Sequence, residues 1–179
     1  MIVENHLVRW TVRIAMLLYV AALAGEIQAT RKGERQATIR RWQRICWTLG
    51  CLVFLVHVAT AFHFQHGWSH RLATEHTAEV AKQVVGWAFG EGIYFNYAFT
   101  LLWSLDVAWM WLGPVRREQR ARWMTVVLHV FMLTIVVNGA IIFATGPTRW
   151  VGLLVLGVLG IFWVSAARHR RQVWQPESP

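Results

Sequence analysis

The sequence predicts an all-α integral membrane protein, a five-helix transmembrane bundle with one outer interfacial amphipathic helix. Of its 179 residues, 56% are apolar and only 15% are charged, whereas soluble domains average about 45–50% and about 25%. The apolar residues form runs of about 20, the length that crosses a bilayer as a helix. The basic residues gather between these runs. We therefore expect a single transmembrane domain over residues 1–179.

Five segments are candidate membrane spans, and four of them meet the length rule well. The first is weaker because Arg9 and Arg13 lie within it. Long arginine side chains near a helix end can still reach the headgroups, so this segment can also span. The predicted spans cover residues 7–25, 45–65, 93–113, 123–145 and 150–167.

The first segment also resembles a secretory signal peptide, with a basic leader and a cleavage site at Ala22-Leu23-Ala24. Cleavage there would leave the basic loop at 26–44 outside the cell, against the positive-inside rule. With that loop inside, 13 Lys/Arg residues lie on the inner side and three on the outer side, setting aside the two in the first span. The sequence therefore predicts that the N-terminus is outside and the C-terminus inside.

The outer segment at 69–89 has the pattern of an interfacial helix. Val80, Val84 and Trp87 follow helical spacing, and glutamates and a lysine supply the polar face. The glycines from Gly86 onward then break the helix and turn the chain into the third span.

Two ionisable residues lie within the third and fourth spans, where such groups are costly and need a partner or a function. Asp106 and His129 both lie roughly 10 Å below the inner surface at a rise of 1.5 Å per residue. A short loop joins their spans, so the two helices are expected to be antiparallel neighbours. We expect an Asp106–His129 pair that holds two helices together, and the alternative is a pair that carries a proton.

His57 and His129 are the two deepest histidines, and His57 lies on a face of small residues. A buried b-type haem takes axial histidines from facing helices, so these two are candidate haem b ligands. Their predicted depths differ by roughly 9 Å, which is poor for two ligands of one haem iron. The alternative is that His57 simply bonds to a neighbouring helix.

The outer surface holds a concentration of histidines just beyond the second span. His63, His66 and His70 are spaced i, i+3 and i+7, and His76 and Glu79 follow on the next helix. Imidazole and carboxylate groups suit a transition metal such as Zn, Cu or Fe. The sequence thus offers a candidate metal site, which requires the helix to continue through a glycine in the middle of the cluster.

No nucleotide-binding, hydrolase or zinc-ribbon motif occurs, so no catalytic residue is assigned. The charge of +9 is explained by membrane topology, with anionic lipids of the cytoplasmic face as partners and no nucleic acid. The expected function is that of a structural or accessory subunit of an inner-membrane assembly, packed against other subunits or copies of itself. The alternatives are a metal- or haem-binding protein for electron transfer or metal handling, and a small proton or ion conductor using His57, Asp106 and His129.

Overall fold

The computed structural model describes residues 2–29, 36–113, 120–139 and 157, and its described residues form helices without strands. The all-α class is thereby confirmed for this part of the chain. The helices are α1 (Ile2–Ala29), α2 (Gln36–Gln65), α3 (His70–Val85), α4 (Gly92–Leu112) and α6 (Arg122–Val137).

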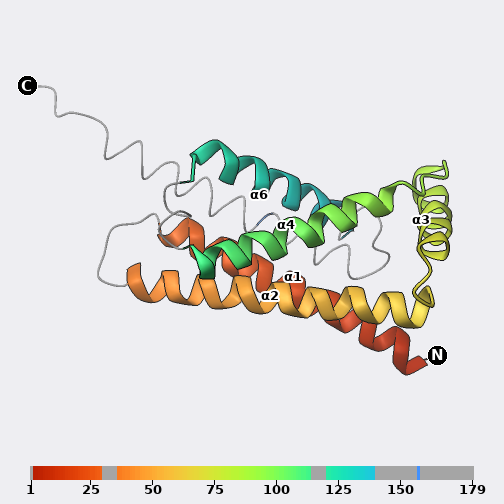
Figure 1. Ribbon diagram of the computed structural model, residues 1–179, viewed down its shortest axis with the longest axis horizontal. Coiled ribbons are helices and arrows are strands. Elements are labelled where there is room, and N and C mark those ends of the chain that lie inside the picture. Colours follow the sequence, from red (N-terminus) through yellow and green to blue (C-terminus); the bar gives the residue numbers. More distant parts are fainter. Residues whose placement is uncertain (1, 30–35, 114–119, 140–156, 158–179) are drawn as a thin grey trace, which may run out of the picture.

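Helices α1 and α2 pack along most of their lengths as an antiparallel pair, and α4 and α6 lie over them (Figure 1). Helix α3 lies across the end of the bundle that also holds the N-terminus (Figure 1). The bundle therefore has two distinct ends: one under α3, and an opposite end where α1 finishes and α2 begins.

Within the described part of the chain, two helices are long and apolar enough to cross a membrane by length and composition. They are His6–Glu26 within α1 and Gln36–Gln65, which is α2. These segments contain the spans expected at 7–25 and 45–65. Helix α4, expected as the span at 93–113, has 21 residues but carries Asn96 and Asp106 and is not one of these two helices. Where the span at 123–145 was expected, the described residues contain a shorter apolar helix, Trp123–Val137. The span expected at 150–167 lies outside the described residues except for residue 157.

The core is built from aromatic rings of α1, α2 and α4. Tyr19, Trp47 and Trp103 are fully buried, and their ring centroids lie 5.3–5.5 Å apart. Gly50 allows this approach, because a Cβ there would lie 3.0 Å from the Trp103 ring and 3.2 Å from Cβ of Leu18. One glycine thus lets α1 and α4 pack closely against the same face of α2.

Helix α3 occupies the position of the interfacial helix expected at 69–89. It begins after Ser69, whose hydroxyl oxygen accepts a hydrogen bond from the Leu72 amide at 3.3 Å. It ends at Gly86, which takes the left-handed conformation (φ 86°) and donates its amide to the Lys82 carbonyl. These two caps fix the length of the helix that closes this end of the bundle.

Candidate functional site

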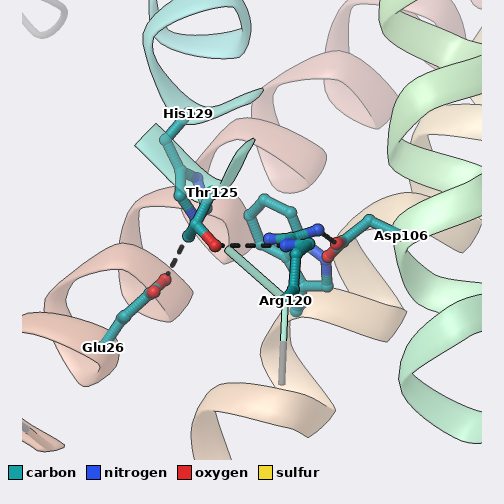
Figure 2. A network of polar contacts seen from close by, with 6 residues as sticks. Glu26, Asp106, Arg120, Thr125 and His129 are labelled. Carbon is teal, nitrogen blue, oxygen red and sulfur yellow. Dashed lines mark hydrogen bonds and ion pairs between the residues drawn. The ribbon is translucent and has the colours of Figure 1, made fainter. Parts of the chain in front are cut away.

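A buried polar network lies at the end of the bundle opposite α3. Asp106 of α4 is 3% exposed, and its Oδ1 accepts a hydrogen bond from Arg120 Nη1 at 2.6 Å. The same guanidinium donates from Nε to the Thr125 hydroxyl at 3.1 Å (Figure 2). Because both charged side chains are almost wholly buried, each one offsets the desolvation cost of the other.

Trp47 of α2 joins this ion pair to a second polar contact. Its indole N–H donates to Oδ2 of Asp106 at 3.0 Å, so both carboxylate oxygens have a donor. Its ring also packs edge-on against His129, at a centroid distance of 5.5 Å. Nε2 of His129 lies 3.2 Å from Oε2 of Glu26 on α1 (Figure 2). Side chains of α1, α2, α4 and α6 therefore meet in one network.

The sequence placed Asp106 and His129 together, and the structure gives both a place in this network. Their charged partners are other residues, Arg120 and Glu26, and Trp47 contacts both of them. The direct Asp106–His129 pair stays a prediction. The sequence pattern did not single out the three connecting residues, because Arg120 and Glu26 lie outside the predicted spans and the uncharged Trp47 does not stand out as a polar partner.

His57 lies far from this network, on the half of α2 nearer α3. Its Nδ1 is 3.0 Å from the carbonyl oxygen of Val8 and 3.4 Å from the hydroxyl of Thr11, both on α1. The ring also contacts Phe54. His57 thus bonds to a neighbouring helix, which was the alternative to haem ligation.

The structure does not bring His57 and His129 together as haem ligands. His57 bonds to α1 at Val8, whereas His129 contacts the same helix at Glu26. These two points are about 27 Å apart along a helix that rises 1.5 Å per residue. Two nitrogens that ligate one metal ion lie only roughly 4 Å apart. The two-histidine haem site is therefore not formed.

The outer histidines also take different directions. Nδ1 of His63 accepts from the Trp68 indole at 3.3 Å, while His70 contacts the hydroxyl groups of Tyr94 and Tyr97. His66 alone meets a second histidine, with its ring centroid 5.3 Å from that of His76.

Among the described residues, no three His, Cys, Asp or Glu side chains form a group that could hold a metal ion. The metal site expected at His63, His66, His70, His76 and Glu79 is thus not assembled.

The chain path after α2 explains why the outer histidines do not converge on one site. The helix stops at Gln65, and Gly67 and Trp68 take positive φ angles of 53° and 60°. The Trp68 amide bonds back to the Phe62 carbonyl, and the Ser69 amide bonds to that of His66. A left-handed turn therefore replaces the continuous helix that the i, i+3, i+7 spacing required.

A cavity of about 690 Å³ occupies the half of the bundle nearer α3. Its walls come from α1, α2, α3, α4 and α6, and most of the lining side chains are apolar. Along α2 the lining runs from Phe54 to His66, about 18 Å at the helical rise. The cavity is therefore elongated, and its volume is in the range of small-molecule sites.

Two buried polar atoms on the cavity wall have no hydrogen-bond partner among the described residues. They are Nδ1 of His66, whose side chain is 7% exposed overall, and the hydroxyl of the fully buried Tyr19. An unpaired buried polar group costs about 1–3 kcal/mol. Each atom is covered by neighbouring protein atoms, so it is a cost to the fold and not a contact point for a bound molecule.

Burial and the neighbouring His76 lower the pKa of His66 below its ordinary value of 6.5. The folded protein therefore binds fewer protons at this site than the unfolded chain does as the pH falls through 6.5. We expect the stability gained from the neutral imidazole to be present above pH 6.5 and lost progressively below it. Thermal unfolding at about pH 7.5 and about pH 5.5 measures this loss, and His66→Gln should reduce it. An identical pH dependence in the variant would contradict the assignment.

Comparison with family models, with curated proteins and with solved structures gave no match for this chain. The site is therefore interpreted from its own geometry. It consists of a polar network at one end of the bundle and a mostly apolar cavity in the half nearer α3.

Proposed function

We propose that this chain is a multi-pass inner-membrane protein whose cavity binds an amphipathic molecule. The observation that carries the proposal is the elongated cavity of about 690 Å³, whose mostly apolar lining includes a few polar side chains such as His57 and Asn96. A few polar groups within an otherwise apolar pocket are the usual means by which proteins orient a largely apolar ligand. We propose that the protein binds this molecule and does not transform it chemically.

The membrane setting is supported by the side chains that face outward. Large apolar residues are exposed on every long helix, including Leu17 of α1, Leu52 of α2 and Leu105 of α4. Such surfaces are rare on soluble monomers. In contrast, Asp106 and Arg120 satisfy each other inside the bundle. This distribution suits a lipid environment, with the N-terminus outside and the basic loop at 26–44 facing anionic lipids.

In this orientation the cavity lies in the outer half of the membrane, beneath α3. Its contents would be shielded from bulk water by that helix and would remain accessible to a molecule carried in the bilayer. The accessory role predicted from the sequence would then be to hold a membrane-borne molecule for a larger assembly.

Native mass spectrometry of the full chain, released from detergent micelles, tests the proposal. Ala61 lines the cavity, so Ala61→Phe should fill part of it and remove a co-purifying apolar molecule. Ala59→Phe is the matched control, because Ala59 is exposed on the same helix and is not part of the lining. We expect bound mass in the wild type and in Ala59→Phe. Equal occupancy in both variants would overturn the cavity as the binding site.

A further inference from the structure

Arg13 places a positive charge on the cavity wall, within a helix that is long and apolar enough to cross a membrane. It follows His6, the first residue of the apolar segment His6–Glu26, by seven positions, or about 10 Å along the helix axis. Its guanidinium carbon lies 5.4 Å from the centroid of the Trp10 ring, and both residues are exposed and line the cavity. An ionisable group at such a depth is costly, which makes Arg13 a candidate binding residue.

Helices α2 and α4 bring polar side chains to the cavity near the level of Arg13. The Thr11 hydroxyl of α1, two residues before Arg13, lies 3.4 Å from Nδ1 of His57 on α2. A stack of rings joins His57 through Phe54 to Phe99 of α4, with centroid distances of 5.7 and 4.9 Å. The polar residues that line the cavity within one turn of this stack are His57, Asn96 and Thr100.

The charge of the lining favours an anionic group on the ligand. Arg13 is the one Lys, Arg, Asp or Glu residue among the lining residues that the structure describes. A guanidinium presents a planar fork of N–H donors that matches a carboxylate with two parallel hydrogen bonds. The Thr100 hydroxyl already donates to the Asn96 carbonyl at 2.7 Å, whereas the side-chain amide of the exposed Asn96 supplies further N–H donors on the cavity wall.

The shape of the cavity favours a single hydrocarbon chain behind that anionic group. On α1 the lining continues from Arg13 to Val20, and on α2 it runs from Phe54 to His66. A mostly apolar cavity of about 690 Å³ suits one chain better than the two chains of a phospholipid. A phospholipid headgroup is also held at the membrane surface, whereas Arg13 lies about 10 Å along α1 from the start of the apolar segment. A small carboxylate can reach that depth.

We propose that the cavity binds a long-chain fatty acid, with its carboxylate paired to the Arg13 guanidinium. This inference rests on the proposed function, because it needs the cavity to be a binding site. It adds the class of ligand and the residue that recognises the charge of that ligand.

The test uses the tagged full chain in phosphatidylcholine nanodiscs and measures binding of tritiated palmitate and tritiated hexadecanol by scintillation proximity. The two probes share a hydrocarbon tail and differ in charge. Arg13→Gln should weaken palmitate binding about tenfold and leave hexadecanol binding unchanged. Arg13→Lys keeps the charge without the planar fork and should recover part of the affinity. Arg9→Gln is the matched control, because Arg9 is exposed one turn earlier on the same helix and is not part of the lining. Elution volume on size exclusion verifies that each variant is folded.

The possible results separate this inference from the proposed function. Tighter binding of palmitate than of hexadecanol, lost in Arg13→Gln and kept in Arg9→Gln, supports the fatty acid. Equal losses in both arginine variants overturn it, because they report surface charge alone. Equal binding of the two probes, unchanged in Arg13→Gln and removed by Ala61→Phe, overturns the fatty acid while the cavity remains a binding site. Displacement of palmitate by phosphatidylglycerol at a lower concentration than by palmitate itself overturns it in favour of an anionic phospholipid. Absence of any bound molecule in wild type and variants overturns both proposals.

Discussion

Replacing Asp106 with leucine should lower the thermal unfolding temperature of the detergent-solubilised protein by about 10 °C. The change leaves the Arg120 guanidinium buried without its carboxylate and the Trp47 indole without its acceptor. Breaking a buried ion pair by removing one partner costs about 3–5 kcal/mol, because the remaining charge stays desolvated. Leu105→Ala is the control, since Leu105 is adjacent and exposed, and its effect should be small.

A double-mutant cycle separates loss of the ion pair from general damage to the helix. Arg120→Leu alone should also destabilise the protein, because it removes the guanidinium that pairs with the buried Asp106 carboxylate. The double variant Asp106→Leu/Arg120→Leu removes both charges together, and a buried pair replaced by apolar groups is often neutral in stability. We therefore expect the double variant to be more stable than either single one. Strictly additive losses would show that the two side chains do not act as a pair.

Trp47→Ala should be the second most damaging single change, with a loss of about 3 kcal/mol. The residue packs against Tyr19, Trp103 and His129 and is the second donor to Asp106. Its removal leaves a hole where four helices meet and takes one hydrogen-bond donor away from the Asp106 carboxylate. Denaturant or thermal unfolding in detergent measures the effect.

Two further variants divide this loss into packing and hydrogen bonding. Trp47→Phe keeps a ring in the core but removes the indole donor, and we expect a loss of about 1 kcal/mol or more. Trp42→Ala is the control, because Trp42 lies on the same helix and is 62% exposed. Wild-type stability in Trp47→Phe would mean that the bond to Asp106 contributes nothing. A loss in Trp42→Ala equal to that in Trp47→Ala would contradict a specific role for the buried indole.

The helical class could be predicted from the sequence because long apolar runs have few alternatives to helices. The depth of Asp106 and His129 could also be estimated from the helical rise. Their partners could not be predicted, because Arg120 and Glu26 lie just outside the predicted spans. Long side chains reach back along the helix axis, so the charge of a loop can lie inside the bundle.

The outer histidine cluster shows where helical periodicity stops being informative. The spacing of His63, His66 and His70 predicts one face only while the helix continues. Left-handed φ angles at Gly67 and Trp68 rotate the later residues away. A glycine in that position was the one local feature that could indicate a break. The cavity had no sequence pattern at all, because its lining comes from five separate helices.

The most direct measurement of the central claim is photolabelling in native membranes with a diazirine-bearing fatty acid, mapped by peptide mass spectrometry. The account predicts label on cavity residues such as Phe62 and Leu133, removed by excess unlabelled fatty acid and by Ala61→Phe. Label on outward-facing residues such as Leu52 and Leu105 should resist competition, since it reports only bulk lipid. Label confined to those outward-facing residues would contradict a binding cavity in this protein.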